Sequence, residues 1–244
     1  MTTFAELWNK GYFLWLLSNE NPATPAGGHT AAFFYGVLGV GLLVVSMLIP
    51  YLLGSINSAV IISRVRYGDD VRRHGSGNAG MTNMLRTYGK GAAVATLLGD
   101  VLKTAIAVSI ASCLMSVQLG GWIAGLFCMI GHVFPVYYGF KGGKGVLCAA
   151  TAIGVLSWEA LVILLLLFVG VVAMSKYVSL GSILSAGMLP IVINFLNAMK
   201  GTGGINGFIS IAMALFVIWC HRSNIKRIQN RTENKLSFKK KKSE

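Results

Sequence analysis

Long apolar segments joined by short polar connections are the feature that most limits what this chain can fold into. A helix needs roughly 20 apolar residues to cross the hydrocarbon core of a membrane. Seven segments are candidates, and the fourth is short enough to be a half-span or a broken helix: Phe33–Ser63, Ala92–Val117, Gly121–Tyr138, Val146–Leu156, Glu159–Ser175, Leu180–Asn197 and Ile205–Cys220. The pattern predicts an all-α membrane protein with seven transmembrane helices.

The amino-acid composition supports a lipid environment. Hydrophobic residues make up 55% of the 244 residues and charged residues only 12%, whereas a soluble domain carries about a quarter charged residues. We expect no cleavable secretory signal, because the first long apolar run lacks a small-residue cleavage pattern after it. Three regions are predicted: a semi-polar interfacial extension over 1–30, a seven-helix membrane domain over 31–228 and a basic cytoplasmic tail over 229–244.

Lysine and arginine are distributed unequally between the two sets of loops. One set contains little beyond Lys10 and Lys200, whereas the other contains Arg64, Arg66, Arg72, Arg73, Arg86, Lys90, Lys141, Lys144, Lys176 and the stretch from Arg222 to Lys242. Because basic loops stay in the cytoplasm, we predict an outside amino terminus and a cytoplasmic carboxyl terminus. The Lys239–Lys242 run is interpreted as a contact for anionic headgroups. No nucleic-acid partner is expected, because the remaining soluble length is too short for a folded nucleic-acid module.

Metal chemistry is not expected. The chain has eight aspartates and glutamates in all, without clustering, and its four cysteines lie in apolar runs without metal-ligand spacing. Any chemistry therefore has to come from the polar connections.

The connection over residues 68–86 combines glycines with hydrogen-bond donors. Gly75, Gly77 and Gly80 would let backbone N–H groups converge on an anion, and a helix starting near Ala79 would add its amino-terminal dipole. The side-chain donors are Ser76, Asn78, Thr82, Asn83 and Arg86. A flexible surface loop of ordinary turn formers is the alternative. We favour a phosphate site because three arginines lie in this connection.

A second glycine-rich connection, residues 139–146, lies on the same predicted side. Gly142, Gly143, Lys144 and Gly145 would pair a backbone anion nest with a mobile ammonium. The segment follows the physical logic of a P-loop but fails that motif, because no Ser or Thr follows the lysine. It is predicted to bind phosphate together with the first connection.

Two pairs of polar residues and one histidine lie close to the same side. His221 and Asn224 share a helix face, because they are three residues apart, and spacing alone leaves a polar helix cap and a place in the site as equal alternatives. For Asp100 and Lys103 we favour a structural ion pair that positions the first loop, and a catalytic pair stays open as the alternative. His132 stays open between a packed histidine and a catalytic one.

These residues occur in an order that resembles the bacterial acyl-phosphate:glycerol-3-phosphate acyltransferase family. The matching stretches, spread over about residues 35–235, are Gly54–Ala59, Arg72 with Gly75–Arg86, Gly99–Lys103, Gly131–Gly145 and His221–Arg227. Asn57 and Ala79 stand where the family usually has proline, and Met81 stands where a small residue is common. These departures affect the expected loop shape more than the chemistry.

The resemblance implies a multi-pass enzyme of the bacterial inner (plasma) membrane whose site opens to the cytoplasm. The implied reaction moves a fatty acyl group from acyl phosphate to the 1-hydroxyl of sn-glycerol 3-phosphate, giving lysophosphatidic acid and phosphate without a cofactor. This is the first step of phospholipid synthesis. Carried over by position, the catalytic residues are Ser76, Arg86, Lys144, His221 and Asn224. The phosphate loops are Gly75, Gly77, Asn78, Gly80, Thr82, Asn83, Gly142, Gly143 and Gly145.

Direct attack of the glycerol hydroxyl is the expected mechanism, because an acyl phosphate is already an activated anhydride. No aspartate lies five residues after any of the four histidines, so the charge-relay type of acyltransferase lacks its residues here. The proton is expected to pass to a substrate phosphate or to His221. The alternatives are a transporter of a phosphorylated solute, which would usually have internal repeats and a midplane site, a structural subunit, and a metal-dependent phosphotransferase.

Overall fold

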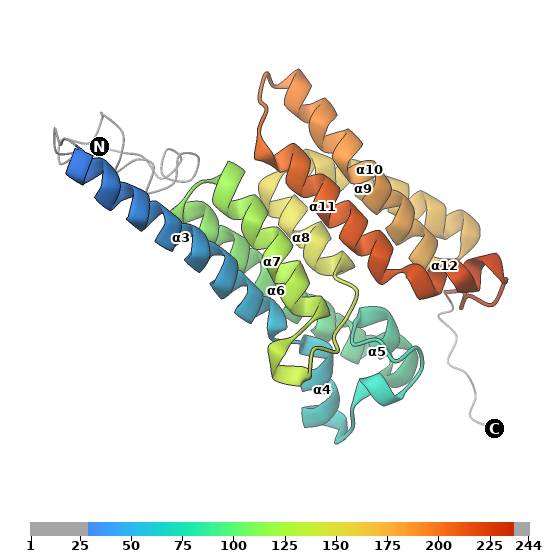
Figure 1. The fold of residues 1–244 in the computed structure, drawn as a ribbon. Coiled ribbons are helices and arrows are strands. Elements are labelled where there is room, and N and C mark those ends of the chain that lie inside the picture. The colour runs from blue at the N-terminus through green and yellow to red at the C-terminus, as the bar shows by residue number, and fades with distance from the viewer. Residues whose placement is uncertain (1–28, 237–244) are drawn as a thin grey trace, which may run out of the picture.

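The computed structural model describes residues 29–236, with side chains from residue 36 onward, and this part of the chain is helical without strands (Figure 1). The predicted interfacial extension and the end of the basic tail lie outside the described residues. The α-helices are α3 (His29–Ser55), α4 (Ser58–Tyr67), α5 (Met81–Tyr88), α6 (Lys90–Leu114), α7 (Trp122–Val133), α8 (Val146–Leu156), α9 (Trp158–Ser175), α10 (Val178–Met199), α11 (Ile205–Cys220) and α12 (Arg222–Gln229). Short helical turns are η1 (Val71–Arg73), η2 (Val117–Gly121) and η3 (Val136–Tyr138).

Five helical segments within residues 29–236 are long and apolar enough to cross a membrane. They are Gly36–Tyr67, α6, Val117–Tyr138, α9 and α10, and a sixth results if α11 and α12, bent by 55°, are counted as one span. The 11 residues of α8 measure about 17 Å, which is little more than half of the roughly 30 Å hydrocarbon core. The structure thus supports five or six spans, and seven spans remain a prediction.

Large apolar side chains point outward along these helices. Eleven of them are at least 60% exposed: Val40, Val65, Leu98, Leu102, Trp158, Leu166, Met174, Phe195, Met199, Phe208 and Leu215. A water-soluble protein rarely exposes apolar surface on this scale. Lipid is therefore the solvent that suits these faces.

The first apolar segment, predicted as one run over 33–63, is divided into two helices. Asn57 caps the second one, because its Oδ1 accepts a hydrogen bond of 3.1 Å from Val60 N. Its Nδ2 donates to Ala79 O at 3.3 Å and so reaches the first polar connection. Asn57 is fully buried. The apolar run is interrupted because a buried side-chain cap, which hydropathy does not detect, starts a new helix.

The third apolar segment ends earlier than its predicted limit at residue 138. Helix α7 stops at Val133, two residues before Pro135, which confirms the expected effect of that proline on the helix. The chain then makes the short turn η3 before the second polar connection.

Close backbone contact joins α3 to α7. A Cβ placed on Gly54 would lie 2.1 Å from Cys128 O, and one on Gly131 would lie 2.1 Å from Tyr51 O. Small residues of this kind let two membrane helices approach closely. Tyr51 Oη strengthens the contact by donating to Phe134 O at 3.0 Å.

The polar connections gather at one end of the helix bundle. In Figure 1, α4, α5 and α12 lie at this end, whereas the start of α3 and the α10–α11 connection lie at the opposite end. A small cluster of buried apolar side chains supports the first connection: Ala59, Val60, Val71, Ala79, Met84 and Ala92. Polar connections that are far apart in the sequence therefore lie together at this end of the bundle.

Candidate functional site

A cavity of about 420 Å³ brings together three polar segments. Its polar lining includes all five residues predicted to be catalytic: Ser76, Arg86, Lys144, His221 and Asn224. Five of the nine predicted phosphate-loop residues also line it: Asn78, Gly80, Thr82, Asn83 and Gly145. Gly75, Gly77, Gly142 and Gly143 are not part of the lining, so any contribution they make to the cavity is through the shape of the loops.

The first loop is folded around the side chain of Asn83. Its Oδ1 accepts from Ser76 N at 3.0 Å, and its Nδ2 donates to His74 O at 3.0 Å and to Val71 O at 3.1 Å. Gly75 has a φ of 56°, and a Cβ there would lie 2.3 Å from Asn83 Oδ1. Asn83 therefore holds the loop in shape through three hydrogen bonds to its backbone.

Two of the three glycines expected to form an anion nest in the first loop, Gly77 and Gly80, have N–H groups that are engaged within the protein. The N–H groups of Ser76, Gly77, Ala79 and Gly80 all donate to acceptors within the protein. The free N–H groups lie one step later, at the start of α5, where Gly80 is the N-cap without a side-chain cap. The first turn of a helix leaves N–H groups without a partner in that helix, so the start of α5 offers N–H donors beside the first loop.

The second loop also differs from the expected backbone nest. Gly142 N donates to Val133 O, and Gly143 N donates to His132 O, both at 3.1 Å. These N–H groups are unavailable to an anion because the loop is docked on the last carbonyls of α7. What the loop presents to the cavity is Lys144, followed by the first turn of α8.

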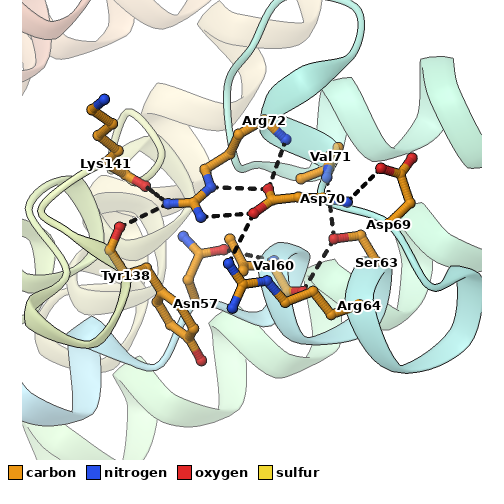
Figure 2. A network of polar contacts seen from close by, with 10 residues as sticks. All are labelled: Asn57, Val60, Ser63, Arg64, Asp69, Asp70, Val71, Arg72, Tyr138 and Lys141. Carbon is orange, nitrogen blue, oxygen red and sulfur yellow. Dashed lines mark hydrogen bonds and ion pairs between the residues drawn. The ribbon is translucent and has the colours of Figure 1, made fainter.

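Arg72 joins the two loops (Figure 2). Its guanidinium forms a two-point ion pair with Asp70, Nε to Oδ1 at 2.9 Å and Nη2 to Oδ2 at 2.7 Å. Its Nη1 donates to Tyr138 O at 2.8 Å and to Lys141 O at 3.0 Å. Hydrogen bonds from Arg72 hold the pKa of Asp70 below its usual value. The ion pair therefore stays charged, and Arg64 adds a further bond of 3.0 Å to Asp70.

Lys144 and Asn224 meet across the cavity. Lys144 Nζ donates to Asn224 Oδ1. Burial lowers the pKa of Lys144 to about 8, with repulsion from Arg227 and Arg86 acting in the same direction. An anion bound beside this ammonium would offset that repulsion and favour the charged form.

Asn224 is held in place by a carboxylate that the sequence analysis did not assign. Its Nδ2 donates to Glu233 Oε1 at 2.7 Å, and the same oxygen accepts from Ser179 Oγ at 2.8 Å. Arg227 Nε donates to Glu233 Oε2 at 2.7 Å. Burial would raise the pKa of Glu233, but these three hydrogen bonds hold it below its usual value. Asn224 is thereby oriented with its oxygen toward Lys144.

His221 lies at the bend between α11 and α12. Its Nδ1 is 2.8 Å from Val217 O, and because a carbonyl can only accept, this nitrogen carries the proton. The Nε2 of the neutral ring is then an acceptor. His221 and Asn224 both line the cavity, and their place in the functional site stays a prediction.

Arg86 contributes positive charge to the cavity. Among residues 29–236 it forms no ion pair or hydrogen bond that would engage its guanidinium, and it lines the cavity. Its charge is close enough to lower the pKa of Lys144. Two basic groups, Arg86 from α5 and Lys144 from the second loop, therefore face one cavity.

The rest of the cavity wall is mostly apolar and comes largely from α8, α9, α10 and α11. It includes Ile153, Leu161, Leu164, Phe168, Leu189, Met213 and Val217. A molecule with an anionic head and a hydrocarbon tail fits a cavity divided in this way. Within the described part of the chain, no group of three His, Cys, Asp or Glu side chains could hold a metal ion.

Known proteins match the part of the chain that forms the helix bundle and most of the cavity. The family model described as glycerol-3-phosphate acyltransferase matches residues 44–231. A curated glycerol-3-phosphate acyltransferase of Halalkalibacterium halodurans is 44% identical over 202 residues, covering 78% of this chain and 93% of the relative. One from Clostridioides difficile is 40% identical, covering 81% of this chain and 97% of the relative.

Two solved structures have a similar fold. The crystal structure of PlsY (YgiH), an integral membrane glycerol 3-phosphate acyltransferase, in its glycerol 3-phosphate form gives a TM-score of 0.72 at 32% identity. Its lysophosphatidic acid form gives a TM-score of 0.70 at 30% identity. Each comparison covers 80% of this chain and 96% of the PlsY chain. The similarity therefore extends over nearly the whole of that membrane protein.

Proposed function

The chain belongs to the glycerol-3-phosphate acyltransferase family, and we propose that it transfers a fatty acyl group from an acyl phosphate to the 1-hydroxyl of sn-glycerol 3-phosphate. The products are lysophosphatidic acid and inorganic phosphate. The observation that carries this proposal is the single cavity in which two basic loops, the polar bend at His221 and an apolar wall meet. Both substrates carry phosphate, and one also carries a hydrocarbon chain, so each part of the cavity has a ligand group to contact.

The protein is a multi-pass membrane protein, and we propose seven crossings with the cavity facing the cytoplasm. The bundle end that holds α4, α5 and α12 (Figure 1) also holds most of the basic residues, and basic loops stay cytoplasmic. Soluble glycerol 3-phosphate would enter from that side. The proposed location is the bacterial inner (plasma) membrane, where the acyl chain can reach the apolar wall from the lipid.

Each of the two loops is proposed to bind one of the two substrate phosphates. Arg86 and Ser76, with the start of α5, would contact one phosphate. Lys144, oriented through Asn224, would contact the other. Cationic and N–H donors that are already in place stabilise charge as it develops on a leaving phosphate, without reorganisation during the reaction.

The reaction needs no covalent acyl-enzyme. The glycerol hydroxyl oxygen forms a bond to the acyl carbonyl carbon, and the bond from that carbon to the phosphate oxygen breaks. The hydroxyl proton ends on the departing phosphate, so atoms and charges balance. His221 Nε2, as the acceptor nitrogen of its ring, would orient a glycerol hydroxyl within the cavity.

A direct assay tests this function. Purified protein is incubated with palmitoyl phosphate and labelled glycerol 3-phosphate, and in parallel with palmitoyl-CoA as the donor. Labelled lysophosphatidic acid formed from acyl phosphate is expected, with little or none formed from the thioester. Uptake of labelled glycerol 3-phosphate into vesicles without any product would instead identify a transporter and refute the proposal.

A further inference from the structure

A buried ionic cluster lies just behind the phosphate-facing loops. The side chains of Ser58, Asp100, Lys103 and His132 are each at most 9% exposed. Lys103 Nζ lies 2.8 Å from Asp100 Oδ1, which also accepts from Ser58 Oγ at 2.9 Å. Burying a charged side chain inside a membrane span costs free energy. Four polar residues in mutual contact at such a position therefore indicate a specific role.

The ammonium of Lys103 also binds the break between α3 and α4. It donates to Ile56 O at 2.8 Å and to Gly54 O at 3.1 Å. The last carbonyls of a helix have no partner within that helix, so Lys103 supplies one from α6. The break is followed directly by Asn57, which bonds to Ala79 in the first loop.

The fourth contact of Lys103 leads to the second loop. Its Nζ lies 3.0 Å from His132 Nδ1. An ammonium has three N–H donors and no acceptor, so these donors are shared among the four neighbours and the ring nitrogen faces the ammonium as an acceptor. His132 O receives the hydrogen bond from Gly143 N. Gly143 is packed against the ring so closely that a Cβ there would lie 2.0 Å from His132 Nε2. The position of the ring therefore fixes the position of the loop that carries Lys144.

We propose that Lys103 is a positioning residue of the site: its buried ammonium ties the α3–α4 break and His132 together, and so sets the spacing between the two phosphate loops. This inference rests on the proposed function for the identity of the ligands that the loops bind, but not for the spacing of the loops. Asp100 and His132 also line the cavity, so the cluster is in direct contact with the space that the loops enclose. Through these contacts Lys103, a side chain of α6, positions both loops.

A simpler role is that the ion pair only neutralises its own charges. Removing one partner alone cannot separate the two roles, because it leaves an unpaired buried charge that destabilises the protein. The double variant Asp100→Asn/Lys103→Met removes both charges and keeps an acceptor for Ser58. A second double variant, Asp100→Asn/Lys103→Gln, is also neutral but restores N–H donors at position 103.

The test measures equilibrium binding of labelled glycerol 3-phosphate, kcat/KM for both substrates, and the thermal midpoint in detergent. We expect the Met variant to keep its midpoint but to lose at least about tenfold in kcat/KM for both substrates and in affinity for glycerol 3-phosphate. The Gln variant is expected to recover part of that loss. Thr96→Val is the matched control on α6, because within residues 29–236 the buried Thr96 hydroxyl bonds only to Ala92 O of its own helix, at 2.8 Å.

A folded Met variant with kcat/KM within about twofold of the parent would overturn the proposal. Loss of the fold in both neutral double variants would also overturn it, in favour of a purely structural role. Failure of the proposed function has a different signature, because the parent protein itself would then form no lysophosphatidic acid. The binding measurement does not depend on acyl transfer, so it tests the spacing of the loops in either case.

Discussion

Lys144 and Asn224 are hydrogen-bonded to each other although 80 residues separate them in the chain. Lys144 comes from the loop before α8, and Asn224 comes from α12. Glu233 fixes the amide of Asn224 from its other side. The lysine is therefore held in place by a residue that is itself held, which is the arrangement expected of a preorganised charge for an anionic substrate.

Replacing Lys144 is expected to disable the enzyme without unfolding it. Lys144→Ala should reduce kcat/KM by about 100-fold or more, because one preorganised charged donor is lost from the site. Lys141→Ala is the matched control: it removes the same charge from an exposed side chain of the same connection. Steady-state assays with both substrates, beside thermal midpoints, check the prediction. A Lys144→Ala enzyme with full turnover would remove this residue from the site.

The pH dependence should report the same lysine. With its pKa lowered to about 8, Lys144 is protonated below that pH and loses its charge as the pH rises. Phosphate binding needs the charged form, so KM for glycerol 3-phosphate should rise above about pH 8, by at most about tenfold per unit. Lys144→Arg, which stays charged, should shift this rise to higher pH.

Initial rates from about pH 7 to about pH 9.5 avoid the second ionisation of a phosphate monoester near pH 6. Acyl phosphate is kept saturating, and the stability of each variant is recorded at both limits. Superimposable KM profiles for the parent and the Lys144→Arg variant would show that another group controls the dependence.

Arg72 should act on activity through the two loops that it joins. Arg72→Lys keeps the charge but cannot keep both the two-point bond to Asp70 and the bonds to the carbonyls of Tyr138 and Lys141. We expect about a tenfold fall in kcat/KM, with a smaller effect on the thermal midpoint. Arg73→Lys, at the exposed neighbouring position, is the control and should behave as the parent. Equal effects from the two substitutions would argue against a specific role for Arg72 (Figure 2).

Much of the fold could be predicted because hydropathy and proline act locally. The long apolar runs became α6, α9, α10 and α11, and Pro135 follows the end of α7 as expected. The break at Asn57 was missed because it depends on a side-chain cap and on a hydrogen bond to Ala79, neither of which changes the apolar pattern.

The site was predicted as a set of residues but not as a set of contacts. Glu233 gave no signal, because it lies beyond α12 and reaches Asn224 only after the chain turns back, with Leu236 N donating to Lys176 O at 2.8 Å. The N–H groups of Gly142 and Gly143 were predicted to form a backbone anion nest. They are taken by α7 carbonyls, which only tertiary packing reveals.

Stability should depend on the close contact between α3 and α7. At Gly131 an added methyl group would meet backbone atoms, 2.1 Å from Tyr51 O and 3.0 Å from Ser55 N, so the helices would have to separate. We expect Gly131→Ala to reduce the free energy of unfolding by about 1–3 kcal/mol. Gly170→Ala is the matched control in α9, because a Cβ there has no neighbour within 4 Å.

Denaturation by sodium dodecyl sulfate in mixed micelles, followed by circular dichroism, measures both glycine variants. The control should be neutral or more stable by about 0.5–1 kcal/mol, because alanine favours a helix over glycine. Gly131→Ala should also lower activity, since Gly131 lies next to His132, whose carbonyl holds the second loop through Gly143. If both substitutions behaved alike, close α3–α7 packing would not be what makes glycine necessary at residue 131.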